Sequence, residues 1–290
     1  MPGPPFGQEQ GRMPAGRPAH DLAAAARRRP RRRLLGLGAA GAAVALWASC
    51  STRTAPDPGQ GDEAETPGPG RLTARPAPPV EPGPPPGVHP LGLGSGRDGL
   101  VYVPAGYRSD HPVPLVVLLH GAGGTAQHGL DLLRPLADQA GVLLLAPESR
   151  LSTWDVILGG FGPDVSFIDS ALDRTFRRLA VDPERVAVGG FSDGASYALS
   201  IGLTNGDLFH QVIAFSPGFA SPAERRGSPR LFISHGTGDT VLPIASTSRR
   251  IVPRMRRDGY EVTYREFDGP HAVPPEISRE GLAWFLGGEA

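Results

Sequence analysis

From Val88 onward, short unbroken apolar runs alternate with segments of helical periodicity, and this alternation leaves few possible architectures. The runs at 115–119 and 212–215 consist of β-branched, leucine, alanine and phenylalanine residues bounded by turn residues. Such strands are buried on both faces, as in a parallel sheet covered by helices. Similar runs lie at 100–103, 142–145, 186–188 and 231–233, and a further strand is expected at 262–267. We therefore predict an α/β domain over residues 88–290, with a mostly parallel central sheet and helices on both faces.

The segments between these runs carry helix signals. Val165, Ile168 and Leu172 recur at a spacing of three and four residues, and Pro163 precedes them at a position typical of a first helical turn. Further helices are expected at 196–203, 244–255 and 277–286. The sequence has no internal repeat of the kind that builds a solenoid.

The first 87 residues have a different composition. They contain 17 of the 33 prolines and 13 of the 40 glycines, and few large apolar side chains outside one alanine/leucine run. Ordering such a segment costs conformational entropy with little apolar burial in return. We therefore predict that residues 51–87 form a disordered, extended tether rather than part of a core.

Charge and cysteine content exclude several classes of protein. The chain has 29 basic and 29 acidic residues, but residues 88–290 hold 18 arginines against 22 acidic residues. A nucleic-acid-binding domain would show a basic excess, so no nucleic-acid partner is expected. The single cysteine, Cys50, lies outside this domain, so neither disulfides nor thiolate metal sites are expected there.

Residues 1–50 resemble an export signal. An arginine-rich stretch at 27–33 precedes fifteen uncharged residues at 34–48, which is shorter than the ~20 residues needed for a membrane-spanning helix. Arg31-Arg32-Arg33 resembles a twin-arginine signal. Cys50 follows the apolar stretch, as in a bacterial lipobox, although Trp47 stands where leucine is usual. We predict export to the cell surface or outside, with lipid attachment at Cys50; cleavage near Ala48 and a basic tail with a short anchor are the alternatives.

The strand at 186–188 leads into Gly190-Phe191-Ser192-Asp193-Gly194 and then into a predicted helix. This is a G-x-S-x-G pattern in the strand-turn-helix context in which a serine is exposed on a sharp turn. The two glycines allow strand and helix backbones to approach closely. We predict that Ser192 is a nucleophile, with the helix N-terminus stabilising negative charge beside it.

The strand at 115–119 ends in His120 and a glycine-rich turn at 121–124. Such a turn offers backbone N–H groups to a developing oxyanion, and we assign these donors to Ala122 and Asp193. A phosphate-binding loop is the alternative, but the chain has no lysine to complete one. His120 is expected to hold the turn.

Two further polar residues follow strands at the same predicted edge of the sheet. Asp239 comes after the strand at 231–233, and His271 comes after the strand at 262–267. The order Ser192, Asp239, His271 matches nucleophile, acid and base in one class of serine hydrolase. A histidine base activates the serine, and a carboxylate orients the histidine. Asp268 is the alternative acid, but its position three residues before His271 favours a turn cap.

With these motifs, residues 97–287 resemble the α/β-hydrolase superfamily, in particular its phospholipase/carboxylesterase group and the polyhydroxybutyrate-depolymerase and feruloyl-esterase-like proteins. The resemblance implies an α/β-hydrolase fold and hydrolysis of carboxylic esters through an acyl-serine. Asp193 departs from the glutamine usual after the nucleophile in the first group, which argues against a lysophospholipase role. Peptidase or acyltransferase activity, or a non-catalytic surface-interaction module, are the alternatives.

No large cap domain is expected, because the segments between Ser192, Asp239 and His271 are short. Trp154 and Phe191 are candidate substrate-binding residues, and Phe161 is a further candidate for the wall of the site. We expect a small-molecule or polymeric ester as substrate, and neither a cofactor nor a metal.

Overall fold

The computed structural model describes residues 68–94 and 96–288. They belong to one compact unit, Asp62–Ala290. The predicted export signal at 1–50, the lipidation site Cys50 and the first part of the predicted tether, 51–67, lie outside the described residues.

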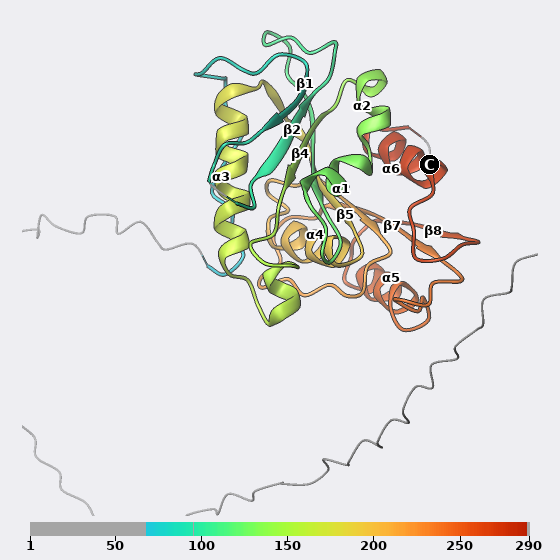
Figure 1. Ribbon diagram of the computed structural model, residues 1–290. Helices are drawn as coiled ribbons and strands as arrows, with labels where there is room; N and C mark the ends of the chain where they lie inside the picture. Colours follow the sequence, from blue (N-terminus) through green and yellow to red (C-terminus); the bar gives the residue numbers. More distant parts are fainter. Residues whose placement is uncertain (1–67, 95, 289–290) are drawn as a thin grey trace, which may run out of the picture. The chain divides into compact units, whose positions relative to one another are not determined.

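Eight strands form one sheet in the order β1-β2-β4-β3-β5-β6-β7-β8 (Figure 1). The strands are β1 (Gly87–Pro90), β2 (Gly99–Val103), β3 (Val113–Leu119), β4 (Leu143–Pro147), β5 (Val181–Phe191), β6 (Gln211–Phe215), β7 (Arg230–Gly236) and β8 (Val262–Phe267). Only the pairs β1–β2 and β2–β4 in this sheet are antiparallel. The mostly parallel sheet is thus confirmed, and the carboxyl ends of β3 to β8 share one edge.

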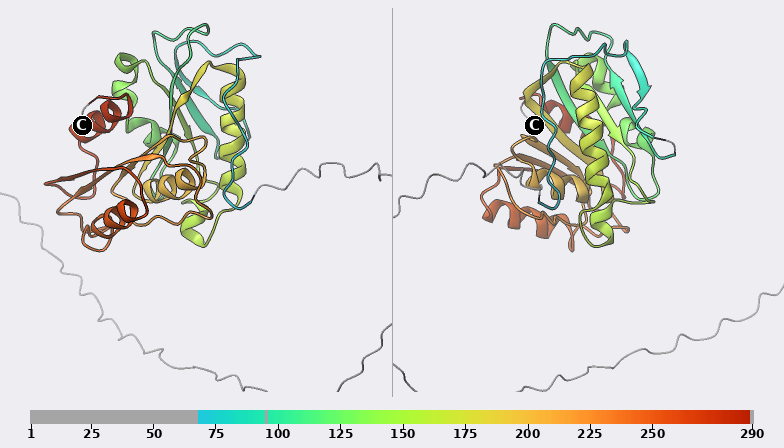
Figure 2. Two further views of the ribbon diagram at one scale, coloured as in Figure 1. Left: turned by 180° about the vertical axis from the view of Figure 1, so that it is seen from behind. Right: turned by 90° about the vertical axis from the view of Figure 1, so that its left-hand side faces the viewer.

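Helices cover both faces of the sheet (Figures 1 and 2). One face carries α3 (Pro163–Arg178), α4 (Asp193–Thr204) and α5 (Ser248–Arg257), and the other carries α1 (Ala126–Asp131), α2 (Arg134–Ala140) and α6 (Pro275–Phe285). Along β3, Leu115, Val117 and Leu119 point into the first core, and Val116 and Leu118 into the second. This burial on both sides explains the unbroken apolar runs. In the part of the chain described, no helix is long and apolar enough to cross a membrane.

The segment that precedes the sheet differs from the sequence-based prediction. Residues 68–86, here called the N-terminal strap, lie along α3 and pack against the domain, as the right-hand view in Figure 2 shows. Leu72 is only 1% exposed and belongs to the core. The amides of Val80 and Glu81 both donate to the carbonyl of Arg177 at 2.9 Å. The predicted disordered tether over 51–87 is therefore wrong for its last part, and β1 begins before residue 88.

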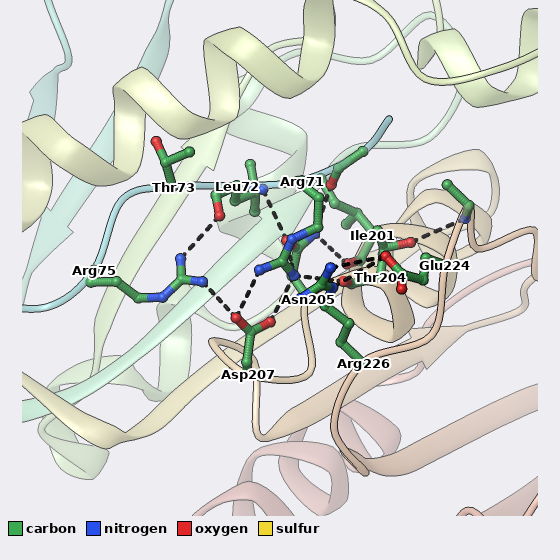
Figure 3. Close-up of polar contacts among 12 residues, drawn as sticks. Arg71, Leu72, Thr73, Arg75, Ile201, Thr204, Asn205, Asp207, Glu224 and Arg226 are labelled. Atoms are coloured by element: carbon green, nitrogen blue, oxygen red, sulfur yellow. Dashed lines mark hydrogen bonds and ion pairs between the residues drawn. The ribbon is translucent and has the colours of Figure 1, made fainter. Parts of the chain in front are cut away.

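The strap is fixed at its start by polar contacts with the C-terminal end of α4 (Figure 3). Asn205 is completely buried, accepts the Leu72 amide at 2.9 Å and donates to the carbonyl of Gly70 at 2.8 Å. Arg71 donates to the carbonyl of Thr204 at 2.8 Å and forms a two-bond ion pair with Asp207. A cation at a helix C-terminus also interacts favourably with the helix dipole. These contacts order a segment whose composition alone favours disorder.

Candidate active site

Ser192 lies between the last residue of β5 and the first residue of α4. Its backbone has φ 58° and ψ −120°, a strained conformation for a residue with a side chain. A Cβ atom on Gly194 would lie 2.1 Å from the carbonyl oxygen of Leu119, and one on Gly190 would lie 2.6 Å from the backbone of Gly194. Neither position accepts a side chain. The two glycines therefore let strand, helix and the end of β3 meet, with Ser192 at the apex of the turn.

Two hydrogen bonds connect Ser192 to His271 and His271 to Asp239 at the carboxyl edge of the sheet. Ser192 Oγ is 2.9 Å from His271 Nε2, and His271 Nδ1 is 2.5 Å from Asp239 Oδ2. Asp239 follows β7 and His271 follows β8, so neighbouring strands deliver the carboxylate and the imidazole. The carboxylate fixes the ring with its Nδ1–H toward Asp239, which leaves Nε2 free to accept from the serine hydroxyl. Asp268, the alternative acid, is exposed to solvent.

The Asp239 carboxylate is held in its charged form. Its Oδ1 accepts the amides of Val241 and Leu242 at 2.9 and 2.8 Å, while Oδ2 faces His271. Burial alone would raise the pKa of Asp239, but the hydrogen bonds from Leu242 and His271 outweigh it and lower that pKa below its usual value. A charged carboxylate is the form that stabilises an imidazolium.

The glycine-rich turn after β3 lies directly against the serine. A Cβ atom on Gly121 would stand 3.5 Å from the Cβ of Ser192. Among the described residues, the Ala122 amide has no acceptor. Asp193 opens α4, where amides lack partners within the helix. The turn after β3 and the first residue of α4 thus both lie next to Ser192.

His120 braces this turn from inside the protein. It is almost completely buried, and burial lowers its pKa, so the ring is neutral. Nε2 accepts the amide of Ser149 at 3.1 Å, which leaves the proton on Nδ1 to be donated to the carbonyl of Gly121 at 2.7 Å. Arg97 adds a hydrogen bond to the carbonyl of Gly124 at 2.8 Å. The sequence did not single out Arg97, because no local motif marks a side chain that acts across 27 residues.

The predicted substrate-binding role of Trp154 is wrong. Its side chain is completely buried, its Nε1–H donates to the carbonyl of His120 at 2.8 Å, and its ring packs against Tyr197. Trp154 therefore supports the turn at His120 from the protein interior and cannot touch a substrate. Phe161 also packs on Tyr197, with ring centroids 5.8 Å apart.

Phe191 and Asp193 flank the serine with different partners. The half-buried ring of Phe191 packs on the ring of His271 at a centroid distance of 4.6 Å and a tilt of 35°. Asp193 accepts a hydrogen bond from Thr153 at 2.6 Å. The Asp193 carboxylate is therefore occupied by the loop after β4.

The described residues present no side-chain arrangement that could bind a metal ion. In residues 68–94 and 96–288, no group of three histidine, cysteine, aspartate or glutamate side chains is arranged to hold a metal ion. The same residues contain no separate domain between the strands that carry Ser192, Asp239 and His271.

The architecture, with Ser192, Asp239 and His271 at one edge of the sheet, is that of an α/β-hydrolase fold. A family profile for phospholipase/carboxylesterase matches residues 164–275, a range that contains all three. The chain is 27% identical over 165 residues to a probable feruloyl esterase C of Aspergillus niger, covering 54% of this chain and 59% of the relative. It is 37% identical over 106 residues to an acetylxylan esterase of Coprinopsis cinerea, covering 33% and 28% of the two chains.

A solved structure shares the fold. The crystal structure of esterase PE8 superposes with a TM-score of 0.52 at 22% identity, covering 61% of this chain and 93% of that one. The chain spans less than two thirds of the length of the curated feruloyl esterases that it matches. The protein thus has an α/β-hydrolase fold, and the relatives that it resembles in sequence are esterases.

Proposed function

We propose that this protein is a serine carboxylesterase that works through an acyl-Ser192 intermediate. The observation that carries the proposal is the continuous hydrogen-bond chain from Ser192 Oγ to His271 and on to Asp239, at 2.9 and 2.5 Å. A serine hydroxyl is a weak nucleophile unless a base within hydrogen-bond reach takes its proton.

In the proposed reaction, His271 Nε2 accepts the Ser192 proton as Oγ attacks the ester carbonyl carbon. The carbonyl oxygen becomes negative and is stabilised by the amides of Ala122 and Asp193. When the carbonyl re-forms, the bond to the alcohol breaks and His271 gives its proton to the alcohol oxygen. A water molecule then attacks the acyl-serine, with His271 again as base, and releases the acid and free Ser192.

The proposed substrate is an ester that joins an aromatic acid or acetic acid to an extended alcohol. The named relatives support both acids, since they include a probable feruloyl esterase and an acetylxylan esterase. Phe191 beside His271 offers an aromatic surface next to the reacting carbonyl. The lack of a cap in the described part of the chain suits a bulky or polymeric alcohol.

The decisive experiment combines active-site labelling with a substrate panel. The full-length protein is treated with a fluorophosphonate and assayed on methyl ferulate, p-nitrophenyl acetate, longer p-nitrophenyl esters and a p-nitroanilide. We expect labelling at Ser192 and turnover of esters but not of the anilide. Absence of labelling together with absence of turnover on every ester would refute the proposal.

We also propose that the enzyme acts outside the cytoplasm, attached through Cys50. The support is the sequence alone: an arginine run, a fifteen-residue uncharged stretch and Cys50 in succession. Firm membrane attachment needs more than one acyl chain, which bacterial lipoprotein modification supplies. Expression of the full chain and of Cys50→Ala in a bacterial host tests this. Equal amounts of soluble, processed protein from both would refute lipidation.

A further inference from the structure

A second histidine contacts the Asp239 carboxylate. His235, near the end of β7, is completely buried, and its Nε2 lies 3.1 Å from Asp239 Oδ2. The same Nε2 donates to the carbonyl of Leu242 at 2.8 Å, while Nδ1 is 2.7 Å from Ser248 Oγ on α5. Two imidazoles therefore face one carboxylate oxygen, and only that of His271 reaches Ser192.

The partners of His235 determine where its proton lies. Nε2 faces a carbonyl and a carboxylate, which are both acceptors, so Nε2 carries the hydrogen. In the neutral ring Nδ1 is then an acceptor, and the Ser248 hydroxyl donates to it. Burial lowers the pKa of His235 and so favours this neutral form.

His235 also closes a ring of contacts around the turn that holds Asp239. It binds the carbonyl of Leu242, and Asp239 Oδ1 binds the amide of the same residue at 2.8 Å. Both the carbonyl and the amide of Leu242 are thus hydrogen-bonded within this turn. Rotation of the carboxylate would break contacts to Val241, Leu242 and His271 together.

The other charges near His235 are few. Glu266 pairs with His235 across β7 and β8, but Arg249 on α5 binds its carboxylate at 2.9 and 2.7 Å. Asp239 and His271 are the remaining titratable groups that act on the ring. Arg249 therefore balances the charge of Glu266, and Asp239 is the anion that His235 contacts.

We propose that His235 is a positioning residue: fixed as a neutral Nε2–H imidazole by Leu242 and Ser248, it orients the Asp239 carboxylate without placing a second positive charge beside it. A protonated His235 would compete with His271 for the charge of Asp239. This inference rests on the proposed serine mechanism, because it assigns His235 a role only through Asp239 and His271.

Two substitutions at this position separate charge from packing. His235→Leu removes the N–H beside Oδ2, and His235→Gln keeps an N–H near the position of Nε2. For the leucine variant of the full-length protein we expect kcat on the best ester to fall by about 10- to 100-fold, because a hydrogen-bonding partner of a charged group is lost. KM should stay within about two-fold, since His235 does not face the substrate; the glutamine variant should recover most of kcat.

The pH dependence of kcat/KM distinguishes a positioning role of His235 from a purely structural one, because loss of packing alone would not shift it. With the His235 N–H gone, the carboxylate interacts more strongly with a protonated His271. The acidic limb of kcat/KM should therefore move to higher pH by about half a unit in the leucine variant. Val252→Ala is the matched control, because it removes buried packing between α5 and the sheet without touching a polar group of the site. An acidic limb unchanged in the leucine variant would overturn the proposal, whatever the loss of kcat.

A spectroscopic test does not depend on activity. Long-range ¹H–¹⁵N spectra of histidine-labelled full-length protein distinguish the two neutral tautomers from the charged ring, and His235→Gln identifies the signal among the eight histidines. We expect His235 to remain the neutral Nε2–H tautomer from about pH 5 to pH 8. Double protonation within that range overturns the inference, and failure of fluorophosphonate labelling in the wild type refutes the serine mechanism independently.

Discussion

The side chain of Asn205 accepts the backbone N–H of Leu72 at 2.9 Å, across 133 positions of the sequence. Asn205 caps the C-terminal end of the helix that begins immediately after Ser192. The N-terminal strap is therefore joined to the same helix that supports the candidate nucleophile, and its removal should affect the whole domain.

We expect Leu72→Ala to destabilise the protein by about 2–4 kcal/mol, because Leu72 is 1% exposed and truncation leaves a cavity. Urea unfolding measures this. Val80→Ala in the same strap is the control, since Val80 is 71% exposed and should change stability by less than about 0.5 kcal/mol. A fragment of residues 68–290 should likewise be more stable than one of residues 88–290. Equal stability of the two fragments would contradict the structural role of the strap.

The strap should also loosen in acid. The two-bond contact with Arg71 lowers the pKa of Asp207. A depressed carboxyl pKa contributes stability above the pKa of the unfolded chain, and this contribution is lost as pH falls toward the folded value. The stability difference between wild type and Asp207→Asn should therefore be full above about pH 5 and shrink below about pH 4. Urea titrations at each pH test this, with the exposed Asp173→Asn as control; a difference independent of pH would argue against the ion pair.

Ser192→Ala should abolish fluorophosphonate labelling and lower kcat on esters by ~10⁴-fold or more, since it removes the nucleophile. Circular dichroism should show an unchanged fold. Ser170→Ala, at an exposed position on α3, serves as the control and should keep full activity. Residual activity that a chelator removes would instead indicate a metal-dependent reaction.

Asp239→Asn and Asp268→Asn distinguish the two candidate acids. Asparagine at 239 can present an N–H to His271 and favour the wrong tautomer, so we expect a loss of ~10⁴-fold in kcat. Asp268 is exposed and should tolerate the change within about two-fold. Steady-state kinetics on one ester measure both, and the reverse ranking would reassign the acid.

Much of the fold was predictable because its signals are local. The strands from β2 to β7 each contain an unbroken apolar run, and alternating residues of each run fill two cores. The relative placement of Ser192, Asp239 and His271 followed from the rule that parallel strands end at one edge. The short helices α1 and α2, of 6 and 7 residues, were not predicted, because so few residues give little periodicity.

The errors concern contacts between distant residues. The strap looks disordered in composition, yet buried Asn205 and paired Asp207 order it from across the chain. Trp154 lies at the predicted edge, but position along the chain does not show that its indole points inward to His120. His235 lies four residues before Asp239, and nothing in the local sequence reveals that its ring faces that aspartate.

The position of the strap determines where tension from the preceding part of the chain would act on the domain. The described chain enters beside the C-terminal end of α4, whereas Ser192 lies at the opposite end of this 12-residue helix, about 18 Å away at 1.5 Å per residue. Tension transmitted through residue 68 would therefore act on the domain near the C-terminal end of α4, which is the end away from Ser192. Attachment through the chain before residue 68 would therefore leave the edge with Ser192 on the side of α4 away from the point of attachment.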